Sequence, residues 1–174
     1  MDSKAVGGWI AVGANLAVLT GLVLVAVQIR QNTASTRAAA YQTWVAAATE
    51  WNMGIATDPE LAAALAQGHL DPGGLSATSQ MQYAMSMLGM MQMVQATYYL
   101  NRDGSFDSEL WELELQRAVA HLTFPGVRQW WDAGAKTQLS PDFVRMVEST
   151  SMSVGTWTWE PGKGYTALAL PSGN

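Results

Sequence analysis

The sequence contains no cysteine among its 174 residues. Disulfide bonds, zinc–thiolate sites, iron–sulfur clusters and thiol nucleophiles are therefore excluded. Charged residues are also scarce, at 13% against the roughly 25% usual for soluble domains. The formal net charge of −5 argues against a nucleic-acid-binding protein. With 49% apolar residues, the chain is expected to fold rather than to stay disordered.

The common catalytic motifs are missing as well, including G-x-S-x-G, H-E-x-x-H and the phosphate-binding and dinucleotide-binding glycine motifs. His69 and His121 lack metal-ligand spacing, since a di-iron site would need Glu-x-x-His pairs. We expect the acidic residues of 103–114 to be solvated in the first turns of a helix, and His69 to satisfy a helix end. We therefore expect no enzyme, no metal and no cofactor; a serine hydrolase that uses His121 as its base is the weakest alternative.

Residues 5–29 carry no charge over 25 positions. At about 1.5 Å per residue, such a helix crosses the roughly 30 Å hydrocarbon core of a bilayer. Trp9 occupies the place of an interfacial aromatic residue, and Arg30 ends the run. A cleaved signal peptide fits less well, because its apolar region usually has about 7–15 residues. The sequence therefore predicts a single-pass transmembrane anchor over residues 1–30.

The flanking positive charges predict the orientation of the anchor. Lys4 precedes the run, whereas Arg30 and Arg37 follow it. The C-terminal side thus has one more basic side chain than the N-terminal side, and this excess favours a cytoplasmic C-terminal domain.

Small residues recur on one side of the anchor. Gly13, Ala17 and Gly21 follow each other at intervals of four, and Asn15 lies near mid-span. A face of small residues lets another transmembrane helix approach closely, and a buried amide usually finds a partner. The helix is thus expected either to pack laterally on other integral membrane subunits or to serve as a generic anchor surrounded by lipids.

Polar residues follow the anchor directly, namely Gln28, Arg30, Gln31 and Asn32. They either lie among lipid headgroups and fix the depth of the helix, or they hydrogen-bond a partner subunit at the membrane surface.

The pattern of residues 31–153 predicts a small water-side helical bundle, so the fold class is all-α. Helices are expected over 31–55, over 59–67 after an N-cap at Thr57 or Asp58, over 108–122, around Trp130 and from Pro141. Residues 72–101 are also free of charge. Gln92 and Gln95, however, make insertion into a bilayer unfavourable, so we expect a core helix of the bundle rather than a second transmembrane helix. Its six methionines are expected to pack in the core, or alternatively to form a pocket for a small apolar ligand.

The last residues, 154–174, alternate apolar residues with glycine and proline and predict an extended tail. The tail is expected either to be a poorly ordered terminus or to dock on a neighbouring subunit. The docking residues would be Trp157, Trp159, Tyr165, Leu168 and Leu170.

Two sequence motifs are the basis of a resemblance to a protein family, which extends over roughly residues 10–150. These are Q-I-R-Q-N-T at residues 28–33, and V-R-Q-W-W at residues 127–131, which contains an R-x-W-W element. With them, the chain resembles a family of bacterial single-pass membrane proteins. The resemblance implies a membrane-anchored helical domain in the bacterial inner (cytoplasmic) membrane, and it transfers no catalytic residue.

The charge deficit does not come from the anchor alone. After Arg30, seven basic and thirteen acidic residues remain among 144, and a small domain living alone in water usually carries more. We therefore expect a non-catalytic accessory or structural subunit of a larger inner-membrane complex, such as a respiratory or photosynthetic assembly. The alternative is a free-standing anchored binding or sensory domain for a small apolar ligand.

Overall fold

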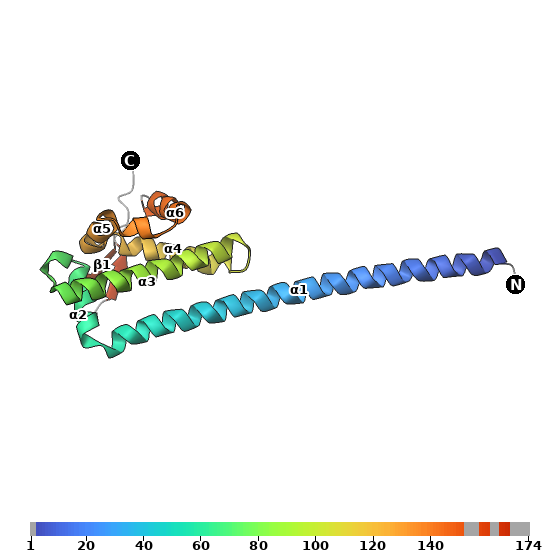
Figure 1. Cartoon of the computed structure of the whole chain (residues 1–174), viewed down its shortest axis with the longest axis horizontal. Helices are drawn as coiled ribbons and strands as arrows, with labels where there is room; N and C mark the ends of the chain where they lie inside the picture. Colours follow the sequence, from blue (N-terminus) through green and yellow to red (C-terminus); the bar gives the residue numbers. More distant parts are fainter. Residues whose placement is uncertain (1–2, 152–156, 161–163, 168–174) are drawn as a thin grey trace. The chain divides into compact units, whose positions relative to one another are not determined.

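The computed structural model describes the backbone of residues 3–151, 157–160 and 164–167, and the side chains of residues 15–151. Within these residues the chain forms six α-helices, two short 3-10 helices and two strands (Figure 1). The expected fold class, a helical chain with one long apolar N-terminal helix, is therefore confirmed.

Helix α1 (Ser3–Thr57) is a single helix of 55 residues. The anchor expected over 1–30 and the helix expected over 31–55 thus form one continuous helix, which ends at Thr57. The helix ends there because Asp58, which precedes a proline, is extended with φ −116° and ψ 98°. The chain divides into two compact units, residues 1–39 and 40–174, and α1 contributes to both.

The second unit contains the helical bundle. Aspartate and serine side chains begin three of its helices: Asp58 caps α2, Ser76 caps α3 and Asp107 caps α4. The elements after α1 are α2 (Pro59–Gly68), η1 (Pro72–Gly74), α3 (Ala77–Arg102), α4 (Ser108–His121), α5 (Pro125–Asp132), η2 (Ala135–Gln138) and α6 (Pro141–Ser151). Helices α2 and α4 pack on α3, and α6 packs on α4 (Figure 1).

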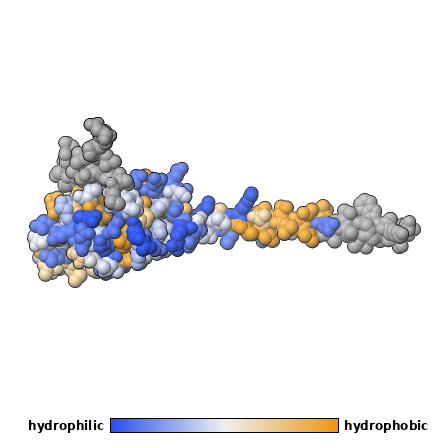
Figure 2. Space-filling model, turned by 90° about the horizontal axis from the view of Figure 1, so that it is seen from above, coloured by the Kyte–Doolittle hydropathy of each residue, from blue (hydrophilic) through white to orange (hydrophobic). Residues whose placement is uncertain are grey.

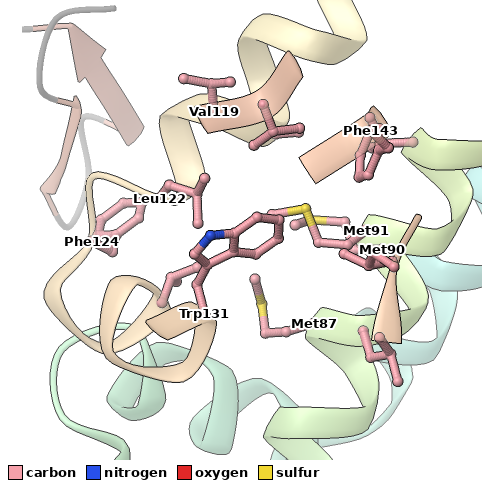
Figure 3. Packing of buried hydrophobic residues seen from close by; sticks show 14 of the residues in the cluster. Met87, Met90, Met91, Val119, Leu122, Phe124, Trp131 and Phe143 are labelled. Carbon is pink, nitrogen blue, oxygen red and sulfur yellow. The ribbon is translucent and has the colours of Figure 1, made fainter. Parts of the chain in front are cut away.

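Trp131 of α5 lies at the centre of the core and is fully buried. Around it lie methionines of α3, apolar residues of α4 and the loop that follows it, and Phe143 of α6 (Figure 3). The indole Nε1 of Trp131 donates a hydrogen bond to Glu148 Oε1 at 3.3 Å. The core thus joins α3, α4, α5 and α6 around one large side chain.

The six methionines of α3 divide between core and surface. Met87 and Met91 are completely buried and Met90 is 5% exposed, which confirms the core expectation for these three. Met81 and Met85, however, are 62% and 51% exposed. The expectation is wrong for these two, because they lie on the side of α3 opposite to the buried residues.

Part of α1 packs on the bundle within the second unit. Trp51 Nε1 donates a hydrogen bond to the backbone oxygen of Ser86 at 3.3 Å, and the Trp44 ring contacts Phe106 with 6.2 Å between centroids. Trp51 and Ile55 pack against the core cluster. The side of α1 that carries Trp51 and Ile55 therefore packs on the bundle, whereas Tyr41 is 45% exposed.

The backbones of α2 and α5 approach each other closely at two glycines. The Gly126 N–H donates to the His69 oxygen at 2.9 Å, and a Cβ on Gly126 would overlap the carbonyl oxygen of Gly68. A Cβ on Gly68 would in turn overlap the Tyr83 ring. Gly126 thus lets the backbone of α5 reach that of α2, and Gly68 makes room for the Tyr83 ring of α3.

Two short strands follow α6, β1 (Trp157–Glu160) and β2 (Gly164–Ala167). They pair in antiparallel fashion, with Trp157 opposite Ala167 and Trp159 opposite Tyr165. The segment expected to be an extended tail thus contains a β-hairpin in its described residues.

Candidate functional site

The first candidate site is the apolar segment of α1. Every residue from 15 to 29 is exposed, including Leu16 at 64% and Ile29 at 61%. Figure 2 shows the apolar side chains that cover this part of the helix. In the part of the chain that the structure describes, α1 is the one helix long and apolar enough to cross a membrane.

The predicted small-residue face lies on this segment. Ala17 and Gly21 are exposed and one helical turn apart, and a Cβ on Gly21 would meet nothing within 4 Å. Asn15 is exposed as well. Gly13 belongs to the same helix, but its side-chain position lies outside the described residues. The face expected to pack on another helix is thus uncovered within this chain at the two positions that the structure describes.

The polar residues that follow the apolar segment are all exposed, but helical geometry separates them into two groups. Gln31 and Asn32 lie three and four positions after Gln28, so these three amides share one side of α1. Arg30 lies two positions after Gln28 and points to another side. The helix therefore offers an amide surface and a separate cation, rather than one cluster.

The tail residues expected to dock on a neighbour are only partly covered by the structure. Trp157, Trp159 and Tyr165 belong to the hairpin, but their side chains lie outside the described residues, as do Leu168 and Leu170 altogether. Docking by the tail stays a prediction.

A second candidate site is a small pocket between α1, α3 and α4, within the second unit. Its volume is about 70 Å³. Glu114 lies in its wall and is only 3% exposed, and one of its oxygens accepts from Arg117 at 2.8 Å. The ten lining residues are Ala48, Trp51, Asn52, Met90, Met93, Val94, Glu114, Arg117, Ala118 and His121.

The buried Glu114 corrects one expectation from the sequence. The acidic residues of this region were expected to be solvated, and Glu109 and Glu112 are indeed exposed. Glu114 is not, and burial raises the pKa of its carboxyl group, although the nearby Arg117 cation lowers it. The available signal was helical spacing, since Glu114 lies three positions after Trp111 and four before Ala118, so that the three share one side of the helix.

The pocket is too small for the apolar ligand of the alternative hypothesis. Drug-sized and cofactor-sized ligands usually occupy about 300–1,000 Å³, whereas this pocket has the volume of about two water molecules. Met87 and Met91 of the core add no space to this pocket, because both are completely buried among other side chains.

Each of the two histidines donates a hydrogen bond from its ring to a backbone oxygen. His69 Nδ1 donates to the Leu65 oxygen at 2.6 Å, which confirms that it satisfies the end of α2. His121 Nδ1 donates to the Arg117 oxygen at 2.8 Å. Burial lowers the pKa of His69 to about 4 and also lowers that of His121. Within the described residues, no group of three or more histidine or acidic side chains is placed to hold a metal ion.

Comparison of the chain with protein-family models, with curated proteins and with solved structures gives no match. The resemblance based on the two motifs therefore remains a prediction. The proposed function depends on the sequence and on the geometry of the chain itself.

Proposed function

We propose that this protein is a non-catalytic accessory subunit of a larger bacterial inner-membrane assembly. The observation that carries the proposal is the uncharged segment of α1, whose side chains from 15 to 29 are all exposed. Surfaces of this kind are stable in lipid rather than in water. Arg30 marks the end of the segment, and the same helix later supplies Trp51 to the bundle.

Lateral association would use the small-residue face of α1. Lipid tails are as apolar as leucine, so transmembrane helices associate by close packing and hydrogen bonds rather than by the hydrophobic effect. Ala17 and Gly21 leave room for that approach, and Asn15 offers an amide whose hydrogen bonds lipid cannot satisfy. We place other integral membrane subunits at this face and lipids around the rest of the helix.

The surface of the domain supports a role within an assembly. Seven basic and thirteen acidic residues among the 144 after Arg30 amount to about 14%, whereas roughly 25% of all residues in a soluble domain are usually charged. Partner subunits that cover part of this surface would explain the deficit. The excess of Arg30 and Arg37 over Lys4 favours a cytoplasmic position for the domain, by one side chain.

The experiment is a co-purification from native membranes in mild detergent, with a tag on the chain. Gly13→Leu, Ala17→Leu and Gly21→Leu fill the small-residue face. Ala26→Leu is the matched control, because at 100° per residue it lies on the side of the helix opposite to Ala17. We expect the three variants on the face to lose most of the co-purified subunits and Ala26→Leu to retain them. Wild-type recovery with all four variants would contradict the proposal, as would an equal loss with Ala26→Leu.

A further inference from the structure

The small pocket between α1, α3 and α4 is lined by side chains of the kinds that bind soft metal ions. Met90 and Met93 line it from α3, and His121 lines it from α4. The two methionines are three positions apart, so both lie on the same side of α3. Thioether sulfur is a soft ligand that favours Cu(I), and imidazole also suits copper. Spacing in the sequence does not reveal this set of ligands, because His121 comes 28 positions after Met93.

His121 has the tautomer and the protonation state of a metal ligand. Its Nδ1 donates to the backbone oxygen of Arg117 at 2.8 Å, so the lone pair of the neutral ring is on Nε2. Histidines that bind metals usually donate their other ring N–H in this way, which fixes the orientation of the ring. Burial lowers the pKa of His121, so the imidazole is neutral at neutral pH, which is the form that binds metals.

The size and the charge of the pocket suit one monovalent ion. A volume of about 70 Å³ holds a single ion with at most one or two water molecules. Glu114, which is 3% exposed, supplies a negative charge beside the ion, and its partner Arg117 has a side chain that is 63% exposed. Glu114 is the one acidic residue among the described residues that line the pocket. A divalent ion would therefore bring more buried charge than this wall can offset.

We propose that this pocket binds one Cu(I) ion through the thioethers of Met90 and Met93 and the imidazole Nε2 of His121. Zinc prefers thiolate, imidazole and carboxylate ligands to thioethers. Magnesium and calcium need about six or more oxygen ligands, whereas Glu114 and Asn52 carry the side-chain oxygens of the described lining residues. Copper binding requires neither a partner subunit nor the small-residue face of α1, so it goes beyond the proposed function.

The test is an anaerobic titration of the detergent-solubilised full chain with Cu(I), in competition with the coloured Cu(I) complex of bicinchoninate. We expect the wild type to remove copper from this complex until each chain holds one ion, and Met90→Leu/Met93→Leu to lose this binding. Met81→Leu/Met85→Leu is the matched control, because it makes the same changes at exposed positions of the same helix. Leucine and methionine are similar in volume, so both double variants should fold. A wild-type chain that removes no copper, or equal losses in the two double variants, would overturn the proposal.

Two further measurements identify the ligands of the ion. X-ray absorption of the copper-loaded wild type should show sulfur neighbours, and a shell of nitrogen and oxygen alone would overturn the proposal. His121→Gln should weaken Cu(I) binding by about 10-fold or more, and unchanged affinity would contradict the assignment of this ligand. This variant also keeps the test valid if the methionine double variant fails to fold. Ala17→Leu should bind copper like the wild type, so the copper site and the role of α1 in the assembly are tested separately.

Discussion

The close approach of α2 and α5 makes Gly126 the position where one methyl group should have the largest effect. In Gly126→Ala, the new Cβ overlaps the backbone oxygen of Gly68 and lies 2.8 Å from Pro72 Cδ. A backbone carbonyl cannot rotate away as a side-chain tip can, so α5 must move away from α2. That movement also lengthens the hydrogen bond from the Gly126 N–H to the His69 oxygen, now 2.9 Å.

The size of the effect follows from three contributions. Overpacking a closed site destabilises a protein by about 1–3 kcal/mol, and loss of the hydrogen bond adds about 0.5–1.5 kcal/mol. The helix preference for alanine over glycine opposes these by about 1 kcal/mol at most. We therefore expect Gly126→Ala to lower the free energy of unfolding by about 2 kcal/mol, and the melting temperature by roughly 4–8 °C for a chain of this size.

The assay is urea unfolding of the detergent-solubilised full chain, followed by tryptophan fluorescence, since Trp131 is completely buried. Gly54→Ala is the matched control, because it adds the same methyl group to a helix where none of the described residues lies within 4 Å. The control should be neutral or slightly stabilising. A midpoint for Gly126→Ala equal to that of Gly54→Ala would refute the close approach.

Two further predictions concern buried ionisable groups. His69 binds a proton less readily when folded, with a pKa of about 4 against about 6.5 when unfolded. Stability should therefore fall as the pH drops from about 6.5 to 4, and His69→Gln should reduce this dependence in urea titrations; identical pH profiles would contradict the expectation. Burial raises the pKa of the Glu114 carboxyl group. The contribution of this group to the stability of the fold therefore becomes less favourable as the pH rises above about 4.3, the usual pKa of glutamate. Glu114→Gln should therefore gain stability relative to the wild type from pH 4 to pH 8, and a constant difference between the two proteins over that range would show that burial does not perturb this carboxyl.

Local signals in the sequence predicted most of the helical framework. A helix start was expected at Thr57 or Asp58, and the Asp58 side chain accepts two backbone N–H groups there. Such caps depend on residues two or three positions away, so they are visible in sequence. The glutamines of α3 argued against a second span, and Gln95 in fact accepts from the Ser140 N–H at 2.6 Å.

Features that depend on distant residues could not be predicted in the same way. Gly126 is constrained by Gly68, 58 positions earlier, and no local pattern signals this contact. The exposure of Met81 and Met85 depends on which side of α3 the other helices cover. For the candidate site, the exposed faces of α1 follow from spacing along one helix, whereas the pocket around Glu114 requires α1, α3 and α4 to come together.

The most direct test of the central claim compares Ala17→Leu with Ala26→Leu in the co-purification from native membranes. The two variants add the same side chain to the same helix, at exposed positions on opposite sides. An accessory subunit that packs through its small-residue face should lose its partner subunits in Ala17→Leu and keep them in Ala26→Leu. Equal recovery of partners with the two variants, or a wild-type chain that purifies alone, would contradict the account.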